Sequence, residues 1–354
     1  SDLLWELNGE TGASHAYETA PTRGSDPALA AAFLGADLDP DEQGRWQISR
    51  IIAGDNSSQQ ARSPLRAPGV AARPGELILA VNGREVGPAG PAELLRGTAD
   101  QPVELRLSRA GVERSVVVRP LPNDTELRYL DWVASRRSAV HRASDGRIGY
   151  VHVPDMISSG WAAFHRDLRI EMARDALLVD TRDNRGGNTS QLVIEKLARR
   201  VVGWSTGRHY PTSSYPASAP RGPLASLANQ HAGSDGDIVN AAFQAMRLGP
   251  VIGTRTWGGV IGIDGRYQLV DGTEVTQPRY SFWFENYGWS VENHGVDPDQ
   301  VVELPPQAWA QGADPQLQAG IDYLLAELDR RPAPPRPDLA QRPSRRAPEL
   351  PPRP

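Results

Sequence analysis

Cysteine is absent from the 354 residues of the chain. Its absence excludes disulfide bonds, thiolate catalysis and cysteine-ligated zinc. Lysine is almost absent as well: Lys196 is the single one, and the other cationic side chains are arginine. No apolar run approaches the length that spans a bilayer, and a net charge of −5 gives no reason to expect nucleic acid as a partner. We therefore expect neither a membrane nor a nucleic acid among the partners.

The composition is that of a soluble globular protein, with 39% apolar and 23% charged residues. A chain of 354 residues is too long for one ordinary core, so two or three domains are expected. The chain begins at Ser1 and enters at once into an apolar-periodic segment, Leu3 to Leu7. We interpret it as a fragment of a longer protein.

Residues 29–120 have the pattern of a mostly-β domain. Short β-type runs alternate with turn signals, among them Asn82-Gly83 and a hairpin around Ala110-Gly111. The stretch G-E-L-I-L-A-V-N-G at 75–83, with a short helix and a closing hairpin after it, resembles a PDZ domain. PDZ modules bind extended peptides by strand addition.

Residues 121–331 have the pattern of an α/β domain. A strand at 147–156, a helix at 160–173 and a strand, Gly-rich turn and helix at 175–202 predict a βαβ unit with a parallel sheet. The remainder, residues 332–354, is rich in proline and arginine, and we expect it to be disordered.

The stretch NQHAGSDGD at 229–237 carries the first chemical signal. The small residues Ala232-Gly233 predict a sharp turn at Ser234, and the periodicity after it predicts an amphipathic helix. A helix N-terminus favours developing negative charge, so Ser234 fits a nucleophile, with the next backbone amide stabilising an oxyanion. The plainer interpretation is that Ser234, Asp235 or Asp237 caps the helix. A serine also needs a base, for which seven histidines and Lys196 are candidates.

The order of motifs along residues 1–330 resembles the tricorn protease family. The motifs are Ser14-His15, the PDZ-like domain, D-T-R-D-N-R-G-G-N, G-S-D-G-D, G-T-R-T-W-G-G, V-E-N-H-G-V-D-P-D and D-P-Q-L. The tail-specific C-terminal processing proteases are more distantly similar. The family resemblance implies a crotonase-like catalytic fold, with residues 1–28 as the end of a first catalytic subdomain, an inserted PDZ domain at 29–120 and a serine protease domain at 121–331. It also implies two N-terminal β-propellers, which this sequence lacks.

The resemblance implies a Ser-His-Ser-Glu tetrad. Ser234 would be the nucleophile, His15 the general base, and Ser14 the bridge to Glu292. The amides of Gly187 and Asp235 would form the oxyanion hole, with Gly186 as the alternative to Gly187. The side chain of Asp235, from a neighbouring subunit, would bind an arginine or lysine of the substrate on the acyl side of the cleaved bond.

Each motif also has a plain structural interpretation. Gly186-Gly187 fits a tight turn, Glu292 a surface turn and Ser14 a cap; their co-occurrence in family order favours the catalytic one. We predict a serine endopeptidase that cleaves peptides, with no metal or organic cofactor, cytoplasmic and assembled as a hexamer. Two alternatives are a PDZ peptide-binding module that has lost activity and a Ser/Lys tail-specific processing protease, against which the scarcity of lysine argues.

Overall fold

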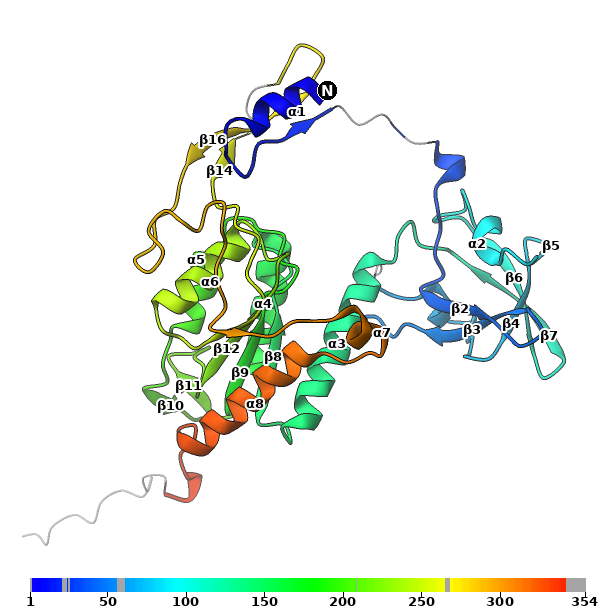
Figure 1. Cartoon of the computed structure of the whole chain (residues 1–354). Coiled ribbons are helices and arrows are strands. Elements are labelled where there is room, and N and C mark those ends of the chain that lie inside the picture. Colours follow the sequence, from blue (N-terminus) through cyan, green and yellow to red (C-terminus); the bar gives the residue numbers. More distant parts are fainter. Residues whose placement is uncertain are drawn as a thin grey trace, which may run out of the picture. The chain divides into compact units, whose positions relative to one another are not determined.

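A computed structural model describes residues 2–20, 24, 26–55, 61–207, 209–264 and 268–341. The chain forms two compact units (Figure 1). One contains residues 1–19 and 139–354, and the other contains residues 20–138. Helix α3 (Thr125–Ala143) begins in the second unit and ends in the first.

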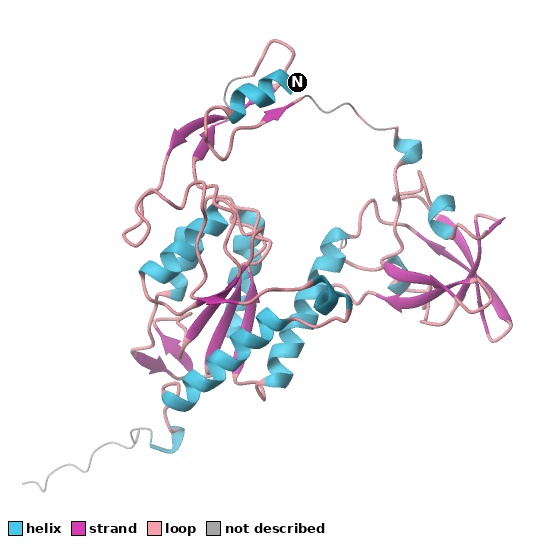
Figure 2. Cartoon of the chain, in the orientation of Figure 1, coloured by secondary structure: helices cyan, strands magenta, loops and turns pink. Residues whose placement is uncertain are grey.

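The second unit is built on an antiparallel sheet (Figure 2). Its strands pair in the order β2 (Ala36–Pro40), β3 (Trp46–Ile51), β4 (Leu77–Val81), β6 (Val103–Arg109) and β7 (Val112–Val118), with β5 (Arg84–Glu85) beside β4. Three short helical segments complete the unit: η1 (Pro27–Leu29), η2 (Pro64–Arg66) and α2 (Pro91–Leu94). Asn82-Gly83 and Ala110-Gly111 each have positive φ, which the twist of a two-residue hairpin requires. The two turns predicted from these pairs are therefore confirmed.

The first unit is built on a five-stranded parallel sheet. The order is β17 (Gln300–Val301), β13 (Val251–Gly253), β12 (Leu224–Ala228), β9 (Ala176–Asp180) and β8 (Ile148–His152). Every residue of β8, β9 and β12 is buried, as expected of a parallel sheet covered on both faces. The predicted α/β domain with a parallel sheet is confirmed.

Helices cover both faces of this sheet. Helices α4 (Ser158–Glu171), α5 (Ser190–Leu197) and α6 (Asp235–Ala245) share an apolar core with Leu177 and Val179 of β9. Helix α8 (Pro315–Arg330) places Gly320 against Leu178. Because successive side chains of a strand point to opposite faces, α8 covers the other face.

Three two-stranded pairs lie outside the main sheet: β1 (Glu18–Thr19) with β15 (Glu274–Val275), β14 (Gly262–Asp264) with β16 (Gln277–Tyr280), and β10 (Gly203–Ser205) with β11 (Ser213–Tyr215). The pair β1–β15 joins the segment after α1 (Asp2–Gly9) to a segment more than 250 residues later. Two distant parts of the sequence are thereby brought together.

The chain after α8 is partly described. Residues 342–354 of the predicted disordered tail lie outside the described residues. Residues 332–341 are described; Arg336 donates to the carbonyl of Ala173, and η3 (Leu339–Gln341) follows. The short helix α7 (Pro306–Ala310) precedes α8. Among the described residues no helix combines the length and the apolar character needed to cross a membrane.

Candidate active site

The carboxyl ends of the parallel strands meet at one edge of the sheet, and Ser234 lies in the loop that follows β12. It occupies the N-cap position of α6 with φ 57° and ψ −118°, a left-handed conformation that costs a non-glycine residue about 1–3 kcal/mol. Its side chain makes no capping hydrogen bond. The capping interpretation is therefore wrong for Ser234. Ser234 lines a cavity of about 680 Å³.

His15 lines the same cavity and is buried. Its Nδ1 lies 3.1 Å from the Oγ of Ser14, which donates to Oε2 of Glu292 over 3.1 Å. A hydroxyl has one proton, so Nδ1 must carry the proton of the first bond. That tautomer leaves Nε2 of His15 with a free lone pair, the form a general base needs.

Burial lowers the pKa of His15, and the negative charge of Glu292 raises it by a smaller amount. The imidazole is therefore neutral at neutral pH and can accept a proton. His231 lines the same cavity, but it has no carboxylate partner among the described residues. Lys196 lies in the last turn of α5 and lines none of the cavities that contain Ser234.

Glu292 is held from two directions. Its Oε1 accepts the amide of Ser14 at 2.8 Å, and its Oε2 accepts the amides of Val260 at 2.8 Å and Ile261 at 3.0 Å. The carboxylate therefore joins the N-terminal segment to the loop after β13. Thr276, which sequence reasoning missed, fixes the same segment: its hydroxyl donates to the carbonyl of His15 at 2.5 Å.

The Gly186-Gly187 turn faces the cavity beside Ser234. The amide of Gly186 is used, because it donates to Oδ1 of Asn184 at 2.9 Å. The amides of Gly187 and Asp235 donate to no protein group in the described part of the chain. Gly187 has φ +144°, and a Cβ there would lie 2.1 Å from the carbonyl oxygen of Met156, so only glycine fits. This geometry favours Gly187 over Gly186 as an oxyanion donor.

Asn184 connects the Gly186-Gly187 turn to the turn that carries Ser234. It is fully buried; its Nδ2 donates to the carbonyl of Val153 at 2.6 Å, and its own carbonyl accepts the amide of Gly233 at 3.0 Å. Sequence reasoning did not assign it a role, although the signal was present as the central Asn of D-T-R-D-N-R-G-G-N.

The carboxylate of Asp235 has a structural position. It is 4% exposed, and it accepts both the amide of Ser190, at 2.8 Å, and the Ser190 hydroxyl. Both oxygens are thus bonded to the first residue of α5. The contact predicted for Asp235 is made across a subunit boundary and stays a prediction; within one chain both carboxylate oxygens are already bonded to Ser190.

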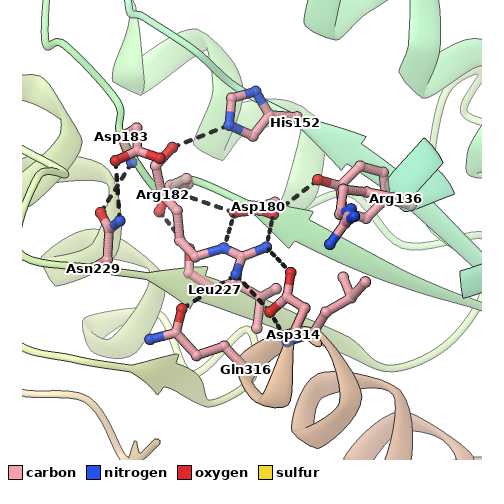
Figure 3. Close-up of polar contacts among 12 residues, drawn as sticks. Arg136, His152, Asp180, Arg182, Asp183, Leu227, Asn229, Asp314 and Gln316 are labelled. Carbon is pink, nitrogen blue, oxygen red and sulfur yellow. Dashed lines mark hydrogen bonds and ion pairs between the residues drawn. The ribbon is translucent and has the colours of Figure 1, made fainter. Parts of the chain in front are cut away.

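A buried ion-pair network holds the start of the loop that runs from β9 to the Gly186-Gly187 turn (Figure 3). Arg182, 5% exposed, pairs with Asp180 at 2.7 Å and with Asp314, the N-cap of α8, at 2.9 Å. Although burial alone would raise it, the charge of Arg182 holds the pKa of Asp180 below its usual value. The network fastens the loop after β9 to helix α8.

A second cavity, of about 640 Å³, opens beside Ser234 on the side of α5 and α6. It shares six lining residues with the first cavity: Gly187, Asn188, Ser234, Ile261, Gly262 and Tyr280. Its remaining wall has an apolar part, made of Ile194, Ile238, Ala242, Val260 and Phe282, and a polar part, made of Ser190, Gln191, Glu195 and Asp235. In the described residues no cluster of three or more metal-ligating side chains occurs.

Comparison with known proteins identifies the two units. The tricorn protease PDZ domain matches residues 32–123, and peptidase family S41 matches residues 147–302. The crystal structure of the tricorn protease superposes with a TM-score of 0.86 at 38% identity, covering 92% of this chain and 32% of that one. The chain is a homologue of the C-terminal region of tricorn protease.

Two further proteins are similar to this chain, one along nearly its whole length and one distantly. Tricorn protease homolog 1 of Streptomyces coelicolor is 57% identical over 341 residues, which is 96% of this chain and 32% of that protein. The photosystem II D1 C-terminal processing protease matches distantly, with a TM-score of 0.38 and 18% identity over 84% of this chain and 80% of that one. This tricorn homologue therefore spans about a third of the length of its curated relative.

Proposed function

We propose that the chain is a serine endopeptidase that hydrolyses peptides. One observation carries this proposal. Ser234, whose backbone is strained, lines the same cavity as His15, whose ring is hydrogen-bonded to Ser14 and through it to Glu292. The S41 match and the tricorn relatives support the same chemistry.

In the proposed reaction Ser234 Oγ attacks the carbonyl carbon of a peptide bond while Nε2 of His15 accepts its proton. The imidazolium is stabilised through Ser14 by the carboxylate of Glu292. His15 then returns the proton to the leaving amine, and an acyl-enzyme remains. A water molecule, deprotonated by His15, hydrolyses the ester and restores Ser234.

The oxyanion of each tetrahedral intermediate would be bound by the free amides of Gly187 and Asp235. These donors are fixed before substrate arrives, by the φ of Gly187 and by the bonds from Asp235 to Ser190. Removing one such donor typically costs about 10²–10³ in kcat.

For the side chain on the acyl side of the cut we propose the second cavity. Its walls, which include Ile194, Ile238 and Phe282, suit a medium-to-large apolar side chain. The alternative contact, a basic side chain paired with Asp235, would require the carboxylate to leave Ser190. By resemblance to the family we also propose peptide substrates, a cytoplasmic location and a hexameric assembly.

Turnover of a fluorogenic peptide, together with labelling by a fluorophosphonate and mapping of the labelled residue, tests the proposal. Ser234→Ala should abolish labelling and lower kcat about a millionfold. His15→Ala should also remove turnover, whereas Lys196→Arg should leave it within about twofold of the parent, since Lys196 lines neither cavity at Ser234. Loss of activity in Lys196→Arg with His15→Ala active would favour the Ser/Lys alternative. Absence of both labelling and peptide turnover in the folded parent protein would favour the alternative of a PDZ peptide-binding module that has lost activity.

A further inference from the structure

The third residue of helix α6, Asp237, is fully buried and takes no part in the proposed chemistry. Its carboxylate accepts three donors from one turn of the chain: the hydroxyl of Thr256, the amide of Gly258 at 2.8 Å and the amide of Gly259 at 3.2 Å. The turn follows β13, so this carboxylate links the helix that begins at Ser234 to the next loop of the sheet.

That turn carries Trp257 against the catalytic histidine. The indole ring meets the ring of His15 edge-on, with centroids 5.2 Å apart and planes at 88°. The indole also lies close to two glycines: a Cβ at Gly233 would be 2.8 Å from it, and one at Gly259 would be 2.2 Å from it. The amide of Trp257 donates to the carbonyl of Ala232 at 3.1 Å.

The same turn continues to Glu292. Val260 and Ile261, which follow Gly259, donate their amides to this carboxylate, and the carboxylate orients Ser14. One turn of chain, residues 256–261, therefore contacts the histidine directly through Trp257 and indirectly through Glu292.

We propose that Asp237 is a positioning residue, which fixes the 256–261 turn to the helix of the nucleophile and thereby sets Trp257 and Glu292 against the histidine segment. This inference rests on the proposed peptidase activity. Ser234 and Ser14-His15 lie far apart in the sequence. The 256–261 turn is one continuous segment that contacts the helix of Ser234 through Asp237 and the histidine segment through Trp257 and Glu292.

A carboxylate suits this position better than an amide. Its two oxygens accept from three donors, whereas asparagine has one accepting oxygen, and its NH₂ group would face a donor. Burial raises the pKa of Asp237, and the hydrogen bonds from Thr256, from the two glycines and from the backbone of Ser234 act in the opposite direction. The helix N-terminus adds further support for a negative charge.

The pH dependence of turnover reports on the position of Trp257. The charged or titratable groups around the His15 ring are Glu292, through Ser14, and Tyr17, whose ring lies 5.8 Å away; Arg185 and His231 line the same cavity. If Trp257 is displaced, water reaches the imidazole and the desolvation that lowers its pKa is relieved. The acid limb of kcat/KM should then move to higher pH.

The test compares Asp237→Asn, Trp257→Ala and the double variant. Asp237→Asn should lower kcat about 10- to 100-fold, a part of the roughly 10²- to 10⁴-fold that a positioned base contributes, and should raise the midpoint of the acid limb. Trp257→Ala should raise the same midpoint. The double variant should be no slower than the slower single variant, because both act through one contact.

Asp299→Asn is the matched control. Asp299 also joins α6 to β13, by accepting Gln244 Nε2 at 3.0 Å and the amide of Val251 at 2.8 Å, but it lies outside the cavities at Ser234. It should leave the midpoint unchanged. If Asp237→Asn does not fold, Thr256→Val removes one of the three donors and should raise the midpoint, while Thr256→Ser should restore it.

Activity of each variant is scaled to sites labelled by the fluorophosphonate. An unchanged midpoint in the folded Asp237 and Thr256 variants, or additive losses in the double variant, would overturn the positioning role. Absence of turnover and labelling in the parent protein would instead refute the peptidase proposal, so the two failures are distinguishable.

Discussion

The orienting carboxylate of Glu292 gives the most direct quantitative prediction, through Glu292→Gln. Glutamine can keep an oxygen at the Oε2 position, which accepts three donors, but its NH₂ group then faces the amide of Ser14. One charge-assisted bond is lost, at about 1.5 kcal/mol, and three become neutral bonds that are weaker by about 0.5 kcal/mol each. The total of about 3 kcal/mol corresponds to a fall in kcat/KM of about a hundredfold or slightly more.

The pH dependence of the same variant has a definite sign. Glu292 raises the pKa of His15, so its replacement by a neutral side chain lowers that pKa further. The base is active when neutral, and the acid limb of kcat/KM should therefore move to lower pH. This direction is opposite to the one expected for Asp237→Asn and Trp257→Ala.

The assay is hydrolysis of a fluorogenic peptide across the titration range of histidine, with rates scaled to labelled Ser234. Glu285→Gln is the control, since Glu285 lies in the same segment, is exposed and has no partner among the described residues. Parental kcat/KM in Glu292→Gln, or an acid limb displaced to higher pH, would refute the orienting role.

Three further predictions concern the loops around the nucleophile. Gly187→Ala places a Cβ 2.1 Å from a backbone carbonyl and should lower kcat about 10²–10³-fold by displacing the oxyanion amide, measured by peptide turnover. Arg182→Ala leaves the buried Asp180 and Asp314 without their cation and should lower the free energy of unfolding by about 3–5 kcal/mol in urea titrations. Ile238→Glu adds a negative charge to the second cavity, so the preferred residue on the acyl side of the cleaved bond should shift from leucine towards arginine by about tenfold. The ratio of kcat/KM for two peptides that differ only at this residue measures the shift, and an unchanged ratio would show that this cavity does not bind that side chain.

The local structure around Ser234 was predictable from sequence. Small residues before Ser234 and helical periodicity after it predicted a turn into a helix, and the structure has both. The hairpin turns and the parallel strands were predictable for the same reason: each is a short-range pattern, set by turn residues or by continuous burial.

The long-range contacts were not predictable from spacing. Nothing in the local sequence of Ser14 indicates that it meets Glu292; that pairing came from family resemblance. The bond between Asp235 and Ser190 was unpredictable for the same reason, because the two residues lie 45 positions apart. The local sequence of Asp237 indicates only a helix cap, because the three groups of the 256–261 turn that donate hydrogen bonds to it lie about 20 residues later.

The bond between Ser14 and Glu292 joins residues 278 positions apart, and this separation has a consequence for the newly made protein. A ribosome that adds about 5–20 residues per second needs about 14–56 s to pass from one to the other. Throughout that interval the histidine has been synthesised but its carboxylate has not. A chain that is still being translated, or that ends before Glu292, therefore lacks the carboxylate that orients Ser14 and His15.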